Sequence, residues 1–486
     1  MFFRYFGRSS KLGLTRPGKV HIIANSMVTA TRSKRASGKK TARTYGSALK
    51  YLFSQTDYEQ MLRVRYNRDT FNLTRMKKLL RQMGDPQKKL RTVHIAGTKG
   101  KGSTAIMLAE MLKACGHKVG LYTSPHICDV RERIMVNGEM ISRAALCRLI
   151  CKAEPRIEGM SNDKPTFFEI FTALALCHFA AKGVKIAVIE AGLGGRLDST
   201  NVLKPDVCGL TSISLDHTQQ LGSSVAKIAE EKAGIFKRNI PVVSVPQVPE
   251  AARVLEKAAR EVRTQLMFTG KDIDFSFRVE SSRTGGCQTR LCLTTPSSQF
   301  EHLTMPLPGA HQALNCGLAL ALLDQLKNRG MEIDDERAKL GLAGVYLPGR
   351  MEVIHNDPRI LVDGAHNAAS VSALMRALGQ HIPYDSLVLV FGCAADKDIP
   401  GIMEQLATGA DKVIFTKATN NTRSAKPEDL AAAYEEASGR QAQIADNIGQ
   451  ALQIAINAVS REDLICITGS FCLVGETKSL LKQKGN

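Results

Sequence analysis

Short hydrophobic runs alternate with longer amphipathic segments along the first half of the chain. The runs that read as strands are Val119–Tyr122, Ile186–Ile189, Val207–Ile213 and Val242–Val245. The segments that read as helices are Phe167–Ala181, Val225–Ile235 and Tyr45–Gln87, the last with an apolar face of Tyr51, Leu52, Tyr58, Met61 and Leu62. Strands that alternate with helices are typical of a parallel sheet covered by helices on both faces. The pattern therefore predicts an α/β fold.

The pattern changes between residues 271 and 305. Phe275–Val279 and Thr289–Leu293 alternate in polarity around Thr284-Gly285-Gly286, which predicts an antiparallel hairpin. A helix is expected next, over Gly309–Lys327. After Tyr346-Leu347-Pro348-Gly349-Arg350 a second series of strands begins, at Ile360–Val362, Leu387–Phe391, Val413–Thr416 and Leu464–Thr468.

A glycine-rich loop joins a strand to a helix between Val93 and Thr104. Apolar residues at helical spacing follow it, at Met107, Leu108, Met111 and Leu112. In such loops backbone N–H groups surround phosphate oxygens, a lysine neutralises charge, and a hydroxyl can bind magnesium. The helix N-terminus adds a partial positive charge. Gly102 departs from the usual spacing, because it separates Lys101 from Ser103. A turn without a ligand is the alternative interpretation.

These observations predict three parts. Residues 1–45 would be a basic flexible leader. Residues 46–347 would form a P-loop parallel-sheet ATPase domain. Residues 348–486 would form a smaller Rossmann-like α/β domain, which has no phosphate loop of its own and closes on the first.

The net charge of +20 on 486 residues resembles that of a nucleic-acid-binding protein. The leader alone carries eleven Lys or Arg and no acid, so the other 441 residues carry only +9. This excess suits anionic small substrates as well as nucleic acid. The chain has no tryptophan, and no basic stripe is interleaved with aromatic residues. The leader resembles an organellar transit peptide; a disordered extension, or a start at Met27, explains it equally well.

No apolar run approaches the roughly 20 residues that span a membrane. The twelve cysteines are scattered and form no CxxC pair. The first observation predicts a soluble protein, and the second favours a reducing compartment. We expect a cytoplasmic protein, or an organellar one if the leader is a transit peptide.

Polar residues follow several of the predicted strands. Open parallel sheets bind their ligands at this edge. Glu190 ends one strand and would be a magnesium ligand or cap the next turn. His217 follows another strand beside Asp216, as a metal or substrate ligand or as a structural histidine. Asp363 could accept ribose hydroxyls or cap a helix, and Arg350 could bind phosphate with two N–H groups. On charge pattern alone, Lys232 reads as a surface lysine at a helix end.

Ten short motifs occur in order along residues 45–480. They are Gly97-Thr98-Lys99-Gly100-Lys101-Gly102-Ser103, Ser124-Pro125-His126, Arg131-Glu132-Arg133-Ile134, Thr166-Phe167-Phe168-Glu169, Glu190–Asp198, Leu215-Asp216-His217, Glu231-Lys232-Ala233-Gly234-Ile235, His311-Gln312-Ala313-Leu314-Asn315, Pro348-Gly349-Arg350 and Asp363-Gly364-Ala365-His366-Asn367. Together they resemble the Mur ligase superfamily, and within it the folylpolyglutamate synthase/dihydrofolate synthase family. Lys99 stands where many bacterial members have asparagine, although lysine also occurs there.

The resemblance implies roles for these residues. The ATP phosphates would be held by Gly97, Thr98, Gly100, Lys101, Gly102, Ser103 and Thr104. The nucleotide site would be completed by Asn315, Arg350 and Asp363. The magnesium ligands would be Ser124, Glu190, His217 and a carbamylated Lys232. The folate or pteroate substrate would contact Thr166, Phe167, Phe168, Glu169, Arg196, Leu197 and Asp198. The catalytic residues would be Lys101, Lys232, His217 and His366, the last near the glutamate.

The chemistry that the resemblance implies is amide synthesis. ATP would phosphorylate a carboxylate to an acyl phosphate, and the amine of L-glutamate would displace phosphate. The expected partners are folate or dihydropteroate, L-glutamate and ATP, with Mg²⁺ and, as an option, a monovalent cation. The chain would be a monomer that binds neither nucleic acid nor membrane.

Three alternatives remain. The enzyme could be restricted to folate polyglutamylation. It could be a Mur ligase for a cell-wall precursor, although Gly102 and Thr166–Glu169 favour the folate branch, since cell-wall ligases usually carry threonine at the position of Gly102. It could also be a nucleic-acid-binding P-loop ATPase. Against this alternative, the positive charge is concentrated in the leader, which is separable from the rest of the chain.

Overall fold

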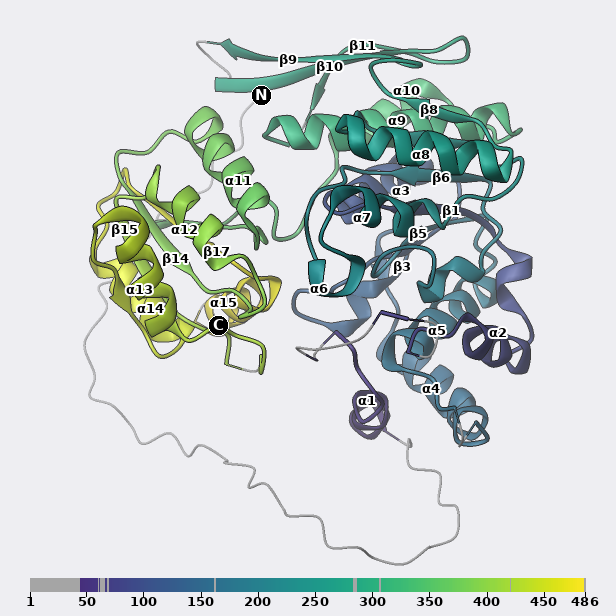
Figure 1. Cartoon of the computed structure of the whole chain (residues 1–486), viewed down its shortest axis with the longest axis horizontal. Helices are drawn as coiled ribbons and strands as arrows, with labels where there is room; N and C mark the ends of the chain where they lie inside the picture. Colours follow the sequence, from purple (N-terminus) through teal and green to yellow (C-terminus); the bar gives the residue numbers. More distant parts are fainter. Residues whose placement is uncertain are drawn as a thin grey trace, which may run out of the picture. The chain divides into compact units, whose positions relative to one another are not determined.

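The computed structural model describes residues 44–59, 61, 66–67, 70–160, 163–282, 286–305, 307–419 and 421–484. Residues 1–43, which hold most of the predicted leader and Met27, lie outside this part. The described strands form three sheets (Figure 1).

The first sheet is mostly parallel and has eight described strands. Their order is β4 (Glu139–Met140), β3 (Ile134–Val136), β2 (Val119–Tyr122), β5 (Ile186–Glu190), β1 (Arg91–Ala96), β6 (Val207–Leu210), β7 (Val242–Ser244) and β8 (Leu266–Phe268). Only β3 runs against the other strands; it pairs antiparallel with β2 on one side and with the edge strand β4 on the other. Since β1 lies between β5 and β6, the loops that follow these three strands are neighbours.

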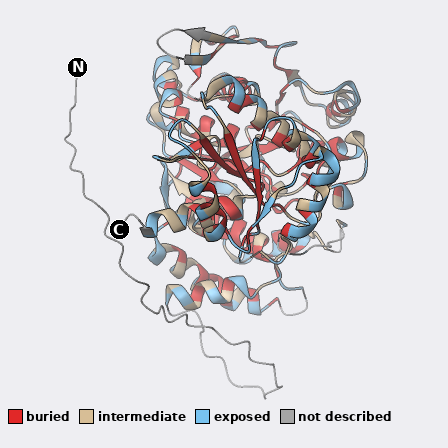
Figure 2. Cartoon of the chain, turned by 90° about the vertical axis from the view of Figure 1, so that its left-hand side faces the viewer, coloured by how far each residue is buried: buried red, intermediate tan, exposed pale blue. Residues whose placement is uncertain are grey.

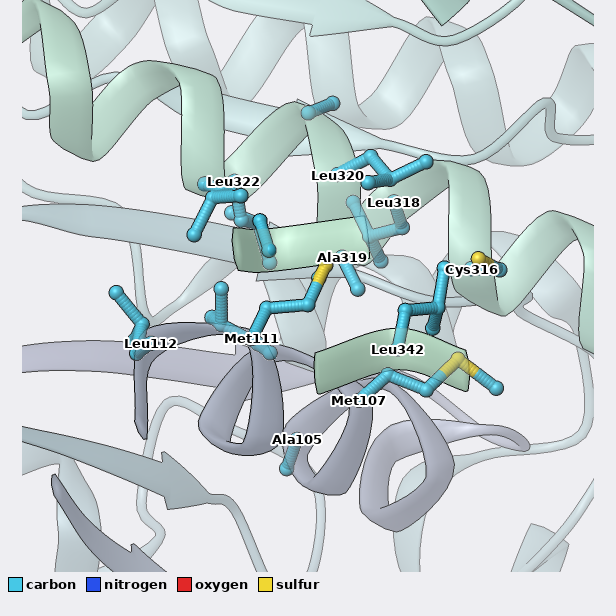
Figure 3. Packing of buried hydrophobic residues seen from close by; sticks show 14 of the residues in the cluster. Ala105, Met107, Met111, Leu112, Cys316, Leu318, Ala319, Leu320, Leu322 and Leu342 are labelled. Carbon is cyan, nitrogen blue, oxygen red and sulfur yellow. The ribbon is translucent and has the colours of Figure 1, made fainter. Parts of the chain in front are cut away.

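Side chains of this sheet alternate between two cores. Ile186 and Val188 of β5 face the core under α3 (Lys101–Ala114), α9 (Ala310–Asn328) and α10 (Asp335–Ala343). Ala187 and Ile189 face the opposite core, as the period of two of a strand requires. Figure 3 shows the first core, in which Met107 of α3 packs with side chains of α9 and α10.

Several helices cover the second face. They are α1 (Tyr45–Phe53), α2 (Leu73–Gln82), α4 (Arg143–Glu158), α5 (Phe167–Ala181), α7 (Val225–Ala233) and α8 (Pro249–Val262). Both faces of the sheet are therefore buried, and Figure 2 shows buried strands flanked by helices with exposed outer sides. The connections also contain one short α-helix, α6 (Thr218–Leu221), and 3₁₀ turns at Pro86–Lys89, Val130–Arg133 and Ser199–Val202.

The predicted hairpin is confirmed as β9 (Asp274–Ser282) and β10 (Gly286–Thr294), which pair antiparallel. A third strand, β11 (Gln299–Met305), was not predicted. A bulge explains the miss: the β10–β11 register shifts between Leu291 and Leu293, and His302 has φ +47°. The extra residue interrupts the alternation of polarity that marks a strand.

The second strand–helix series forms the remaining sheet. Its order is β12 (Glu352–Asn356), β13 (Arg359–Val362), β17 (Leu464–Thr468), β14 (Leu387–Phe391), β15 (Lys412–Phe415) and β16 (Gln443–Ile444), and only β12 is antiparallel. One face is covered by α11 (Ala368–His381), α12 (Ile399–Ala407) and α13 (Pro427–Ser438), and the other by α14 (Ile448–Asn457) and α15 (Phe471–Lys484). The predicted α/β class with parallel sheets is confirmed.

The prediction of helix throughout Tyr45–Gln87 is wrong. α1 ends at Phe53, and α2 begins only at Leu73, where the Asn72 side chain accepts the backbone N–H of Thr74 at 2.9 Å. Tyr58 lies outside both helices, with its ring 5.4 Å from that of Phe71. Leu62 lies outside the described residues. An asparagine cap, which is a strong helix start, interrupts the apolar spacing.

Two further sequence expectations can be compared with the structure. Within the described ranges, no helix combines the length and apolarity needed to cross a bilayer. All twelve cysteines are described, and none of them forms a disulfide.

Acid should destabilise the fold through the histidine buried in α5. Burial lowers the pKa of His178 to about 4, whereas an unfolded chain would bind this proton near pH 6.5. Between these values the unfolded state holds the extra proton, so stability falls as pH falls. Urea unfolding at pH 7 and pH 5 should show a smaller loss of unfolding free energy for His178→Gln than for the wild type. Equal losses would contradict this assignment.

Candidate active site

The loop between β1 and α3 presents a helix N-terminus to a cavity. The backbone N–H groups of Thr98 and Lys99 donate to Ser212 O, at 2.8 and 3.4 Å, which holds the loop against the chain after β6. The next N–H groups belong to the first turn of α3, where no intrahelical acceptor exists. Lys101, Gly102 and Ser103 line the cavity there. The geometry is that of an anion site at a helix N-terminus.

At two positions of the loop only glycine fits, because another residue's side chain lies too close for a Cβ atom. A Cβ at Gly97 would lie 1.7 Å from Thr211 Oγ1, and one at Gly100 would lie 2.0 Å from Asn315 Oδ1. Gly100 also has φ +87°. Thr104 does not reach the cavity, because it is buried and its hydroxyl donates to Asn315 O at 3.3 Å.

The cavity measures about 840 Å³ and lies between residues of the first and second series. Most of the predicted site residues line it. They are Thr98, Gly100, Lys101, Gly102, Ser103, Ser124, Thr166, Phe167, Phe168, Glu169, Glu190, Asp198, His217, Asn315, Arg350, Asp363 and His366. The predicted residues that are not among its lining are Gly97, Thr104, Arg196, Leu197 and Lys232. The structure thus brings together residues that lie far apart in sequence.

Glu190 and His217 line the cavity from segments on either side of β1: Glu190 ends β5, and His217 follows β6 as the N-cap of α6. Glu190 Oε2 accepts the backbone N–H of Ser124 at 3.0 Å, and Oε1 lies 4.0 Å from Lys101 Nζ. Burial raises the pKa of Glu190 and lowers that of His217 to about 4, so the imidazole is neutral at pH 7. Among the described residues, no three His, Cys, Asp or Glu side chains cluster closely enough to hold a metal alone.

The interpretation of Lys232 as a surface lysine is wrong. Its side chain is buried at the end of α7, and Nζ donates to Gly97 O at 2.7 Å. Burial, reinforced by the charge of Lys101, lowers the pKa of Lys232 well below its ordinary value. Lys232 is therefore a buried amine bonded to the glycine-rich loop, and it does not serve as a surface charge that keeps the protein in solution.

A carboxylate joins the loop to the second series. Asp216 forms ion pairs with Lys99 of the loop and, at 2.9 Å, with Lys397, which follows β14. Asn367 Nδ2 also donates to it at 3.2 Å. Burial alone would raise the pKa of Asp216, but the charges of Lys99 and Lys397 hold it well below its usual range.

His366 completes this group. Its Nδ1–H donates to Gly364 O at 2.8 Å, which leaves Nε2 as an acceptor 3.2 Å from Lys99 Nζ. Sequence reasoning found His366 but missed Lys397. The sequence feature that could have indicated Lys397 is the charged run Asp396-Lys397-Asp398, which comes shortly after an apolar strand.

The helix-cap interpretation of Asp363 is wrong. Asn367 is the N-cap of α11, whereas the Asp363 carboxylate accepts the backbone N–H groups of Met351 and Ala365, at 2.9 and 2.8 Å. Arg350 lies over the Phe471 ring, 4.6 Å from its centre. Both side chains therefore face the cavity from the second series.

The segment predicted to contact the acceptor also builds the fold. Thr166 caps α5, and Glu169 closes the capping box while pairing with the buried Arg75 at 2.8 Å. Phe167 is buried in a stack of aromatic rings, and Phe168 lies against the Gly192 backbone, where a Cβ would meet its ring at 2.5 Å.

The Arg196–Asp198 segment divides between surface and interior. Arg196 pairs with Glu231 at 2.6 Å away from the cavity, and Leu197 is buried. Asp198 is buried and lines the cavity wall.

Sequence reasoning missed a second charged group. Arg133 is almost fully buried, and both of its terminal nitrogens bond Glu59, at 2.9 and 2.6 Å. Arg423, after β15, donates to Glu59 O at 2.7 Å. The arginine of the Arg131–Ile134 motif was visible in the sequence, but its partners were not.

Comparison with known proteins agrees with this geometry. Residues 95–323 match the Mur ligase middle domain, and residues 349–471 match the Mur ligase glutamate ligase domain. A Bacillus subtilis dihydrofolate synthase/folylpolyglutamate synthase is 33% identical, over 84% of this chain and 95% of its own. The chain belongs to the folylpolyglutamate synthase/dihydrofolate synthase family.

Two further members illustrate the range of this family. A probable bifunctional folylpolyglutamate synthase/dihydropteroate synthase of Haloferax volcanii is 35% identical over 83% of the chain, which spans only 48% of that protein. The solved structure of Mycobacterium tuberculosis folylpolyglutamate synthase complexed with ADP superposes with a TM-score of 0.80 at 31% identity, covering 90% of this chain and 98% of that one.

Alanine at Gly100 should damage the site more than alanine at Gly116. Both glycines have φ +87° at the ends of α3, so each substitution costs about 1–2 kcal/mol of backbone strain. Only the Gly100 Cβ meets another group, the Asn315 side chain, whereas nothing lies within 4 Å of a Cβ at Gly116. Calorimetry should show lost ADP binding for Gly100→Ala and near-normal binding for Gly116→Ala. Equal affinities would refute the close approach of Asn315.

Proposed function

We propose that this protein is an ATP-dependent ligase that adds L-glutamate to folates. The observation that carries the proposal is that a helix N-terminus for phosphates lines the same cavity as Arg350 and Asp363 of the second series. This arrangement occurs in a chain of the folylpolyglutamate synthase/dihydrofolate synthase family.

ATP would bind with its phosphates at the N-terminus of α3. Lys101 and Arg350 would neutralise the charge that develops on the transferred phosphoryl group, since such transfer needs positioning and charge more than covalent help. The acceptor carboxylate takes the γ-phosphoryl group from ATP, which gives an acyl phosphate and ADP. The amine of L-glutamate then attacks the acyl carbon, loses a proton and expels phosphate, which leaves an amide. Closure of the second series on the first would exclude the water that hydrolyses the acyl phosphate.

The residues at the strand ends fit a magnesium ion. Magnesium is usually bound by one or two carboxylates together with substrate phosphates and water. Glu190 supplies a carboxylate whose Oε1 lies 4.0 Å from the Lys101 ammonium, and Ser124 and the neutral His217 line the same cavity. We propose these three residues as its ligands. When bound, the ion would supply charge neutralisation for the phosphates.

We propose that Lys232 is carbamylated. Carbon dioxide reacts with a neutral amine, and the buried Lys232 Nζ lies beneath the loop at Gly97 O. The product would carry a carboxylate-like charge and would act as a further magnesium ligand. His366, held near Lys99, would lie at the glutamate end of the cavity.

The acceptor would lie against Phe168 and Asp198. We propose both folate and dihydropteroate as acceptors, because the Bacillus subtilis relative is named for both synthases. The alternative is folate polyglutamylation only, as in the name of the Mycobacterium tuberculosis structure. The predicted boundaries, 46–347 and 348–486, and a monomeric state also remain proposals. Cysteines without disulfides support a reducing compartment such as the cytoplasm.

A direct assay tests the function. Purified protein with ATP, magnesium and labelled L-glutamate should incorporate label when tetrahydrofolate or dihydropteroate is added. Label in both products indicates the bifunctional enzyme, and label with tetrahydrofolate alone indicates the restricted one. No incorporation with either acceptor contradicts the proposal.

Lys101→Ala should abolish turnover while leaving the fold intact, because it removes the ammonium group that neutralises phosphate charge. Lys113→Ala is the matched control, since Lys113 lies on the exposed end of the same helix and pairs with Glu110. Glutamate incorporation and circular dichroism should be measured for both variants. Retained activity in Lys101→Ala would refute its assigned role.

Lys232→Ala should lose activity that a small carboxylate restores. Formate or acetate could occupy the space of the missing carbamate, and mass spectrometry of the wild type under bicarbonate should show the added carbon dioxide. Lys237→Ala serves as a control, because Lys237 lies near the same helix end but bonds Asn201. Loss without rescue, and no mass shift, would exclude the carbamate.

A further inference from the structure

A buried histidine of β1 has one bonded ring nitrogen and one bare nitrogen. His94 is fully buried, with Nε2 2.8 Å from Thr200 Oγ1. Its Nδ1 is buried and has no hydrogen-bond partner within the described ranges. Buried polar atoms are nearly always paired, so this asymmetry requires an explanation.

Thr200 connects His94 to a carboxylate. The backbone N–H of Thr200 donates to Asp198 Oδ1 at 2.9 Å, and its hydroxyl donates to the same oxygen. An ionised carboxylate can only accept, so the single hydroxyl proton is already used. Oγ1 can then only accept from His94, which must carry its proton on Nε2. This tautomer leaves Nδ1 as a bare lone pair, in agreement with its lack of a partner.

The chain of hydrogen bonds ends at the cavity wall. Asp198 Oδ2 accepts the backbone N–H of Leu193 at 2.8 Å. Gly192, Leu193 and Asp198 line the cavity. The Gly192 backbone contacts Phe168 so closely that a Cβ would meet the ring at 2.5 Å. Asp198 therefore fixes the turn against which Phe168 packs.

We propose that His94, as its neutral Nε2–H tautomer, is a positioning residue that acts with Thr200 to hold Asp198 and the cavity wall that receives the acceptor. His94 itself does not line the cavity. The charge of Lys237 acts on His94, and its ammonium group is held by Asn201 Oδ1 at 2.5 Å and by Ile235 O at 3.3 Å. The role in acceptor binding rests on the proposed function, whereas the tautomer does not.

The tautomer can be tested without any ligase activity. Nitrogen-15 NMR of the full chain, with His94→Gln to assign the signal, should show a neutral ring with its unprotonated nitrogen at Nδ1. Thr200→Val, which removes the hydroxyl at nearly constant shape, should shift the Nε2 signal. A proton on Nδ1, or a charged ring at pH 7, would overturn the proposal.

Paired substitutions test the positioning. His94→Gln can place a donor where Nε2 lies, whereas His94→Asn places it nearer Nδ1; Thr200→Ser keeps the hydroxyl, and Thr200→Val does not. The Asn and Val variants should raise the KM for the folate acceptor about tenfold, the effect of losing a hydrogen bond in a buried network. The KM for ATP should stay within about twofold, and Gln and Ser should restore most of the acceptor affinity.

The outcomes separate the two claims. Equal changes in both KM values, or no rescue by Gln and Ser, would indicate a merely structural role and overturn the positioning. If His94→Asn fails to fold, the Thr200 pair decides by the same criteria. If the wild type ligates no glutamate, the proposed function fails, while the NMR result still decides the tautomer.

Discussion

The buried carboxylate of Asp216 is the contact on which the site depends. It pairs with Lys99 of the phosphate loop and Lys397 of the second series, and accepts a hydrogen bond from Asn367. Removing the carboxylate would leave the ammonium groups of Lys99 and Lys397 without this counter-charge, and breaking a buried ion pair in this way costs about 3–5 kcal/mol. Because Lys99 and Lys397 come from different sheets, Asp216 couples the shape of the loop to the position of the second series.

Sheet topology explains why Asp216 can do this. β1 lies between β5 and β6, so the phosphate loop, Glu190 and the segment after β6 leave the sheet at adjacent points. The loop gives two of its N–H groups to Ser212 and keeps the first turn of α3 for a ligand. A different order of strands would have separated these groups, even with the same residues at the strand ends. The site is therefore a consequence of parallel order as much as of residue type.

The sequence predicted those features that depend on residues close together in the chain. The loop, the strand ending in Glu190 and the helix over Phe167–Ala181 were readable because each depends on residues within a few positions. Lys232 was misread because its burial depends on Gly97, which is 135 residues away. Lys397 was missed for the same reason, since nothing near it in sequence indicates Asp216. The strand β11 was missed because a bulge removed its period.

Several residues of the cavity are engaged in the fold before any ligand binds. Glu169 neutralises the buried Arg75, Asp198 organises the turn at Leu193, and Asp363 holds two backbone N–H groups. A loss of activity on changing such a residue therefore does not show that it touches a substrate. A role in substrate contact can be separated from a role in the fold only by variants that keep the internal hydrogen bond and change the part of the side chain that faces the cavity. Lys101 and Arg350 differ, because both line the cavity and their contacts within the fold are weak: Lys101 Nζ lies 3.4 Å from Thr98 O, and Arg350 lies over the Phe471 ring. Their substitution therefore reports on ligand charge more directly.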